Sequence, residues 1–210
     1  MRTRTDFELR KHFVHKGKDM KATSSELSPR IVRERGRVHD QALRYLAVSV
    51  KGCQPKRILD VGTGYGTNLR FMANRFGGHS RIWSIDASPW VVREMKRKMR
   101  DHRFSEHVII KKADAEHSSL KSAYFDLVVS LFSLHHLSNP KRGLSEMERV
   151  LSPGGKLIIA DWTPAAGRRL KLHGQSEMPS PKLVVDRLKQ LGFHTQTRLR
   201  PYWYCVEVVK

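Results

Sequence analysis

The feature that most constrains this chain is a short apolar segment that leads directly into a turn with three glycines. The segment is Arg57-Ile-Leu-Asp-Val61 and the turn is Gly62-Thr-Gly-Tyr-Gly66. The apolar run is typical of a buried strand, and glycine permits the positive φ angles of a tight turn. A helix is expected from about Thr67 to Phe76, where Gly77-Gly78 ends it. The turn should therefore present free backbone amides at a helix start to a ligand.

The same alternation of strands and helices continues along the chain. Further strands are expected at residues 81–85, 107–111, 125–131 and 156–160, and further helices at 30–50, 88–99, 140–151 and 181–191. Gly36 weakens the first helix and is a point at which it could divide. Alternation of this kind predicts an α/β fold with three layers, in which helices cover both faces of a mostly parallel, Rossmann-like sheet. Residues 193–199 and 202–209 predict a C-terminal antiparallel hairpin.

The glycine turn does not match the two common phosphate-binding patterns. A dinucleotide fingerprint, G-x-G-x-x-G, would place its third glycine at Thr67. A P-loop would continue with Lys and Ser or Thr, where this chain has Asn68-Leu69. Asp60 lies just before the turn, where a carboxylate would repel a pyrophosphate and attract a cationic group such as an ammonium.

Carboxylates also follow the second and third predicted strands, at Asp86 and Asp114. Ligands of open α/β sheets bind outside the carboxyl ends of the strands, where strand order reverses. Asp86 could accept both hydroxyls of a ribose and Asp114 an adenine amino group, although a single aspartate could equally cap a helix. Three carboxylates at three successive strand ends favour binding. S-adenosylmethionine, which carries an ammonium and a sulfonium but no phosphate, fits them.

Several segments resemble, in order, the motifs of the class I S-adenosylmethionine-dependent methyltransferases. They are Ile58–Gly66, Ser84–Pro89, Ala113–Glu116, Tyr124–Leu137 and Glu146–Leu157. The resemblance covers about residues 57–162 and extends weakly to the C-terminus. It implies that S-adenosyl-L-methionine is the cofactor and S-adenosyl-L-homocysteine the product. It also implies that residues 51–210 form the methyltransferase domain, preceded by a basic N-terminal arm and helix at residues 1–50.

The resemblance further implies which residues hold the cofactor. Asp60, Gly62 and Gly64 would line the methionine portion, and Asp86 would hold the ribose. Asp114 and the backbone of Ala115 would contact the adenine, and Ser130 would lie beneath the sulfonium. The expected cofactor-binding residues are Asp60, Gly62, Thr63, Gly64, Asp86, Ala87, Asp114, Ala115 and Ser130.

His135 and His136 follow the fourth predicted strand, next to the expected methyl group. One of them would be a general base or would orient the acceptor, if the acceptor must lose a proton. Alternatively, both have packing or hydrogen-bonding roles. Methyl transfer from a sulfonium needs mainly orientation and exclusion of water, so no metal site is expected.

Charge and composition leave the methyl acceptor open. The chain has 40 Lys and Arg against 20 Asp and Glu, a formal net charge of +20. Such a charge attracts polyanions, or it keeps a protein soluble by repulsion. Three hypotheses follow: a methyltransferase acting on a small molecule, which is slightly favoured, one acting on RNA or protein through the basic surface, and a non-catalytic donor-binding protein. A monomer and a homodimer are both compatible with the sequence.

Cysteine usage and hydropathy bear on the compartment. The chain has two cysteines, Cys53 and Cys205, without metal-like spacing, which favours a reducing, cytoplasmic location. Charges recur through residues 7–21, so no signal-peptide core is expected there. No run reaches the roughly 18 apolar residues of a membrane-spanning helix, so no membrane association is expected.

Overall fold

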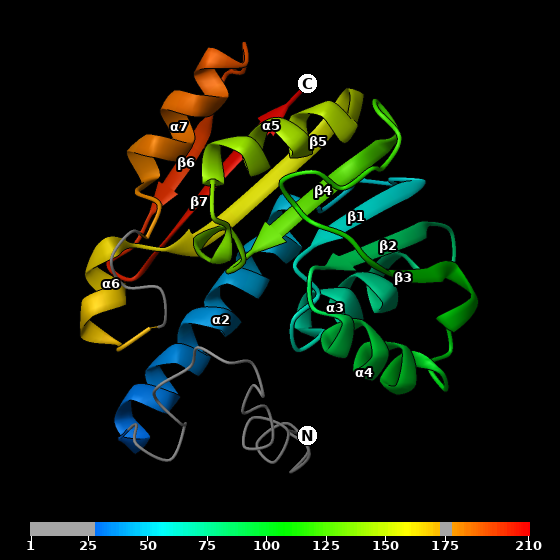
Figure 1. Ribbon diagram of the computed structural model, residues 1–210, viewed down its shortest axis with the longest axis horizontal. Coiled ribbons are helices and arrows are strands. Elements are labelled where there is room, and N and C mark those ends of the chain that lie inside the picture. Colours follow the sequence, from blue (N-terminus) through cyan, green and yellow to red (C-terminus); the bar gives the residue numbers. More distant parts are fainter. Residues whose placement is uncertain (1–27, 173–177) are drawn as a thin grey trace.

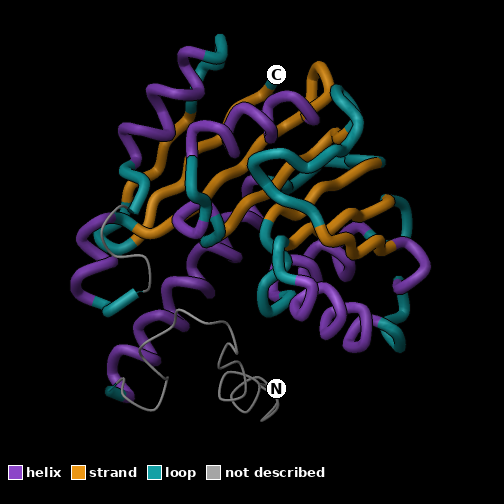
Figure 2. Tube along the Cα trace, viewed as in Figure 1, coloured by secondary structure: helices purple, strands orange, loops and turns teal. Residues whose placement is uncertain are grey.

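The apolar runs expected to be strands come together in one sheet of seven strands (Figures 1 and 2). The computed structural model describes residues 28–172 and 178–210, and the expected basic arm therefore lies largely outside the described residues. The strand order is β3-β2-β1-β4-β5-β7-β6. The strands are β1 (Arg57–Val61), β2 (Arg81–Asp86), β3 (Val108–Lys112), β4 (Phe125–Leu131), β5 (Leu151–Trp162), β6 (Gln196–Leu199) and β7 (Trp203–Val209).

The first five strands are parallel, and the last two form the expected antiparallel hairpin. β7 pairs antiparallel with both β5 and β6. The helices are α2 (Pro29–Ser49), α3 (Thr67–Phe76), α4 (Pro89–Met99), α5 (Pro140–Val150), α6 (Pro164–Arg169) and α7 (Pro181–Gln190), with short 3-10 turns η2 (Ser105–His107) and η3 (Leu134–His136). The predicted mostly parallel, three-layer α/β fold is confirmed.

Alternate residues of each strand build the two halves of the core. Ile58, Leu127 and Ile158 pack with buried residues of α2, α3 and α4 on one face. Their neighbours Leu59 and Val128 pack with α5 and α7 on the other face. Successive side chains of a strand point to opposite faces. The central strands therefore read as continuous apolar runs, because helices cover both faces.

Local chemistry sets where the helices begin. Five of the described helices start with a capping side chain that accepts a hydrogen bond from the backbone three residues later, and each cap is followed by proline. Such a cap contributes about 1 kcal/mol, and proline loses nothing at the first helical position. The caps are Ser28, Ser88, Asn139, Thr163 and Ser180.

Three expectations differ from the structure. Gly36 does not divide the first helix, because α2 is continuous and its buried face offsets the cost of a helical glycine. β5 begins at Leu151 rather than Lys156, since a register shift opposite β4 extends the pairing. α6 lies in a segment where no helix was expected. None of the helices in the described ranges is long and apolar enough to cross a membrane.

Candidate functional site

The glycine turn lies at the carboxyl end of β1, where strand order reverses between β2 and β4. This switch point is where open α/β sheets bind ligands. Gly62 has a φ of 85°, and a Cβ atom there would lie 2.4 Å from the Cβ of Ser133. Only glycine fits this close approach. Gly62 and Thr63 both donate backbone hydrogen bonds to the carbonyl of Ile85, which ties the turn to the end of β2.

Asp60 lies beneath this turn and is fully buried. Its Oδ2 accepts a hydrogen bond of 2.7 Å from the Ser84 hydroxyl. Its Oδ1 accepts none from any described residue, although Asn68 approaches the carboxyl from α3. Burial raises the pKa of Asp60 to about 7, against the lowering effect of the Ser84 hydrogen bond. An unsatisfied buried carboxyl oxygen is costly and is best explained by a missing partner.

Asp86 ends β2 and is half-buried. One oxygen accepts from the backbone amide of Gly64 at 3.1 Å, and the other accepts from that of Ser88 at 2.9 Å. The carboxylate thus links the glycine turn to the start of α4, and each oxygen retains capacity for a second hydrogen bond. Ala87, the next residue, is exposed.

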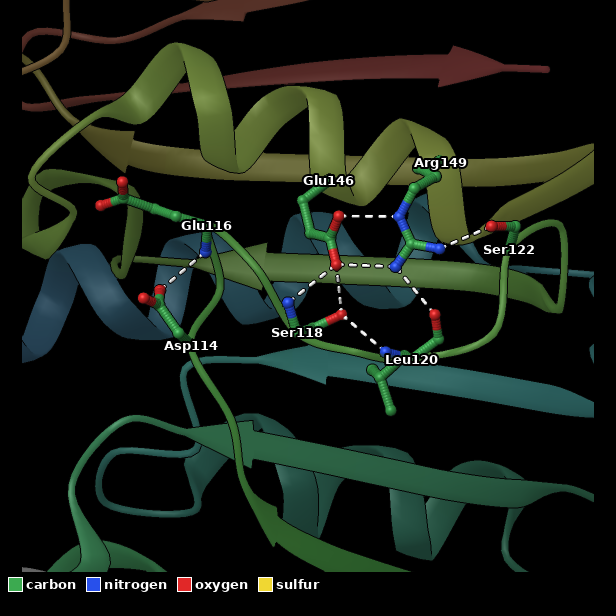
Figure 3. A network of polar contacts seen from close by, with 7 residues as sticks. All are labelled: Asp114, Glu116, Ser118, Leu120, Ser122, Glu146 and Arg149. Atoms are coloured by element: carbon green, nitrogen blue, oxygen red, sulfur yellow. Dashed lines mark hydrogen bonds and ion pairs between the residues drawn. The ribbon is translucent and has the colours of Figure 1, made fainter.

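Asp114 lies beyond the end of β3 in an exposed turn, where it accepts a hydrogen bond of 2.8 Å from the amide of Glu116. Ala115 beside it is half-buried. The loop after this turn is fixed to α5 by a polar network (Figure 3). In that network Glu146 accepts hydrogen bonds from the amide and the hydroxyl of Ser118.

Arg149 completes the network. Its guanidinium contacts both Glu146 oxygens, the Leu120 carbonyl and the Ser122 hydroxyl (Figure 3). The Arg149 guanidinium holds the pKa of Glu146 at about 2, well below its usual range. This network was not predicted from the sequence, where the Glu-x-x-Arg spacing on one helix face was its only signal. The network positions the turn that carries Asp114.

Ser130 is fully buried near the end of β4. Its hydroxyl shares a hydrogen bond of 2.8 Å with that of Ser133, which donates to the Val61 carbonyl at 2.8 Å. Ser130 therefore lies at the switch point. Its hydroxyl is already engaged in joining β4 to the end of β1.

The two candidate histidines lie in different environments. His135 Nδ1 lies 2.7 Å from Asp161 Oδ1, and its backbone amide donates to Oδ2 at 3.0 Å. The side chain of His135 is only 6% exposed, and that of Asp161 is fully buried at the end of β5. His136 is exposed, with its ring centroid 4.0 Å from that of His135. Asp161 was not predicted as a site residue from the sequence, where its only signal is its position at a strand end.

Aromatic rings lie at the ends of β4 and β5. Phe132 and Trp162 have ring centroids 4.6 Å apart, and His39 of α2 lies 4.2 Å from Phe132 and 5.4 Å from Trp162. Phe132 has a φ of 54°, a strained backbone for a bulky residue. Arg35, one turn before His39, donates to the Leu170 carbonyl at 2.7 Å. α2 is therefore fixed across these strand ends and against α6.

The sequence-predicted cofactor residues thus gather at the ends of β1, β2 and β4, with Asp114 beyond β3. His135 lies in η3, just beyond the end of β4, and meets Asp161 of β5. Among the described residues, no three His, Cys, Asp or Glu side chains lie close enough together to hold a metal ion.

Residues 59–159 match the family model of a methyltransferase domain. A probable chloroplastic tocopherol O-methyltransferase of Oryza sativa subsp. japonica is 30% identical over 135 residues, which are 64% of this chain and 36% of the relative. A ubiquinone/menaquinone biosynthesis C-methyltransferase, UbiE, of Bordetella parapertussis is 34% identical over 110 residues, which are 52% of this chain and 42% of the relative. The matched part spans less than half the length of each relative.

Two solved structures share the fold. A putative sarcosine dimethylglycine methyltransferase from Galdieria sulphuraria has a TM-score of 0.70 at 17% identity, covering 88% of this chain and 91% of its own. A geranyl diphosphate C-methyltransferase from Streptomyces coelicolor A3(2), solved with S-adenosyl-L-homocysteine, has a TM-score of 0.72 at 14% identity, with 85% and 80% covered. At these identities the likeness concerns the fold alone.

Proposed function

We propose that this chain, which belongs to the class I S-adenosylmethionine-dependent methyltransferases, transfers a methyl group from S-adenosyl-L-methionine to a small organic acceptor. The observation that carries the proposal is Asp60, a buried carboxyl at the switch point with one oxygen that no described residue satisfies. A cationic ligand group above this carboxyl would offset the cost of its burial. The donor's ammonium is such a group, and the donor brings no phosphate for the carboxylate to repel.

We assign the donor's three parts to three strand ends. Asp60, Gly62, Thr63 and Gly64 would hold the methionine portion, Asp86 and Ala87 the ribose, and Asp114 and Ala115 the adenine. Ser130 would lie beneath the sulfonium. The open acceptor capacity of Asp86 suits paired ribose hydroxyls, and the Glu146–Arg149 network would keep the adenine-contacting turn in place.

The bound donor supplies a methyl group on a positively charged sulfur. The chain's own contribution is orientation of the acceptor and exclusion of water, which can account for much of a methyl-transfer rate. α2 and α6, joined through Arg35, would cover the acceptor at the ends of β4 and β5. His39, Phe132 and Trp162 would form an apolar, aromatic wall of the acceptor site.

We assign the role of general base to His135 and that of a positioning residue to Asp161. In the tautomer whose Nδ1–H donates to Asp161, the lone pair of the ring lies on Nε2. That atom would take the proton from an acceptor that must lose one. His136 is exposed and would contact the acceptor only at the rim of the site.

A small-molecule acceptor is supported by the aromatic wall and by the names of the relatives, a tocopherol O-methyltransferase and a ubiquinone/menaquinone biosynthesis C-methyltransferase. The compartment and the oligomeric state belong to the proposal as well. The two free cysteines, Cys53 and Cys205, favour a reducing cytoplasm, and monomer and homodimer are both retained.

The decisive experiment incubates the chain with methyl-labelled donor and cell extract separated into small-molecule, RNA and protein fractions. With the wild-type chain, label is expected in the small-molecule fraction. With the Asp60→Asn variant, no label is expected in that fraction. Label in the RNA or protein fraction would contradict a small-molecule acceptor and would favour a methyltransferase that acts on RNA or protein through its basic surface. Donor binding by calorimetry without label in any fraction would leave a non-catalytic donor-binding protein.

A further inference from the structure

Helix α4 and the turn after it carry a dense group of basic side chains beside an exposed tryptophan. Trp90, in the first turn of α4, is 43% exposed. The basic residues follow it at helical spacing, so they share the outer side of the helix. We call this surface the α4 basic stripe, and its exposed members are Trp90, Arg93, Lys96, Arg97, Arg100 and Arg103.

Positive charge in the stripe is largely uncompensated. Glu94 pairs with Arg97 at 2.8 Å and with Lys98 at 3.5 Å, which engages the only acidic residue of α4. Within the described ranges, no ion pair reaches Arg93, Lys96 or Arg100. These three cations are therefore available to an anionic partner.

Neighbouring elements add to the positive charge. Arg103, in the turn after α4, donates a 3.4 Å hydrogen bond to Asn74 of α3, and its guanidinium lies 4.7 Å from the centroid of the Phe104 ring. The pKa of His102 is lowered by burial and then by the nearby guanidiniums of Arg103 and Arg70. Like charges packed this closely destabilise the folded chain, so a bound polyanion would relieve the repulsion.

The other side of α4 excludes insertion into a lipid surface. Val91, Val92, Met95 and Met99 are buried in the core against the sheet. A basic amphipathic helix binds a membrane by burying its apolar side in lipid, and here that side is already occupied. What α4 offers is a row of cations beside a partly exposed tryptophan, the combination that binds single-stranded nucleic acid through phosphates and base stacking.

We propose that the α4 basic stripe binds single-stranded nucleic acid, with phosphates on its arginines and lysine and an unpaired base stacked on Trp90. Trp90 to Arg100 spans about 15 Å at 1.5 Å per residue, so the footprint is short. This inference goes beyond the methyl-transfer proposal and does not depend on it. The nucleic acid is a binding partner, whichever molecule receives the methyl group.

The test measures binding of the full chain to a fluorescent single-stranded RNA by anisotropy over a salt series. About four phosphate contacts give a slope of log affinity against log salt near −3, at roughly −0.7 per contact. The double variant Arg93→Gln, Arg100→Gln should flatten that slope by about 1.4. Trp90→Ala should weaken binding by about 5- to 150-fold, from about 1–3 kcal/mol of stacking.

Lys189→Gln is the matched control, because Lys189 is an exposed lysine on α7. α7 covers the sheet far from α4, on the opposite face (Figure 1). The control should keep the wild-type slope and affinity, and the double variant should melt at the wild-type temperature or above. Charges outside the stripe are the same in the wild type and in the double variant, so they cannot produce the difference between these two proteins.

Two results would overturn the proposal. The first is a double variant that stays folded and binds RNA with the wild-type slope. The second is Trp90-dependent binding to vesicles of anionic lipid with no binding to RNA. Unlabelled duplex of the same length serves as competitor, and it should compete more weakly than the single strand because its bases are already stacked.

Discussion

Asp60→Asn is expected to stabilise the donor-free protein at alkaline pH while it weakens donor binding. Burial raises the pKa of Asp60 to about 7 from an ordinary value of 3.8, and no part of the side chain reaches solvent. A shift of about three pKa units corresponds to about 4 kcal/mol, at 1.36 kcal/mol per unit. Asparagine has nearly the same shape, carries no charge and can still accept the Ser84 hydrogen bond.

The direction in which the free energy of unfolding changes with pH follows from proton linkage. Below about pH 4 the carboxyl is protonated in both the folded and the unfolded chain, so it contributes nothing. Between about pH 4 and 7 the unfolded chain releases the proton while the folded chain keeps it, and stability falls as pH rises. Above about pH 7 the full cost of about 4 kcal/mol is present. The free energy of unfolding of the variant minus that of the wild type should therefore grow by about 4 kcal/mol between pH 4 and pH 8.

Urea denaturation of both proteins at several pH values measures this difference, in which the titration of every other group cancels. Donor affinity should show the opposite pattern. In the wild type it should rise by up to tenfold per pH unit below about pH 7, as Asp60 ionises. In the variant it should be low and flat. A stability difference that stays constant with pH would refute the reasoning, because it would mean that Asp60 is not desolvated in the folded chain.

Three further outcomes are expected. Asp161→Asn should lower kcat while donor affinity stays unchanged, because the ring of His135 loses its carboxylate partner, and His135→Gln should lower kcat further. Wild-type kcat in both variants would make the His135 contact purely structural. Gly62→Ala should lower the free energy of unfolding, measured by urea denaturation, by about 2–4 kcal/mol, because alanine is strained at this positive φ and its Cβ would collide with Ser133. Gly154→Ala should lower it by only about 1 kcal/mol, because φ is also positive there but the space is open. Glu146→Gln should lower the free energy of unfolding by about 1 kcal/mol at pH 7, after allowance for solvent screening. The interactions that lower the pKa of Glu146 stabilise the folded chain fully only above about pH 4.5, where the carboxyl is ionised in the unfolded chain too. That cost should shrink as pH falls towards 2, and a pH-independent cost would contradict it.

The fold was predictable from the sequence where local chemistry decides it. Ser88 followed by Pro89 sets a helix start through a side-chain cap and a fixed φ angle, and the structure begins α4 there. The glycine turn after β1 is equally local, since its conformation needs glycine whatever lies around it. For the same reason the end of β1 was placed correctly at Val61, and that of β2 within one residue of Asp86.

The site was less predictable where residues distant in sequence meet. His135 and Asp161 lie 26 residues apart on neighbouring strand ends, and only the pairing of β4 with β5 brings them together. Ser133 fills the space beside Gly62 for a similar reason, since β4 lies next to β1. The position of α2 over the ends of β4 and β5 depends on tertiary contacts such as that of His39 with Phe132. Hydropathy patterns carry no signal for such contacts.

Calorimetry of the purified chain with individual adenosyl compounds and nucleotides tests the central claim most directly. The carboxylates at the switch point suit a ligand without phosphate. They predict saturable binding of S-adenosyl-L-methionine and S-adenosyl-L-homocysteine at one site, with no binding of a nicotinamide dinucleotide or a nucleoside triphosphate there. Binding of either phosphate compound at that site, without affinity for the two adenosyl compounds, would contradict it.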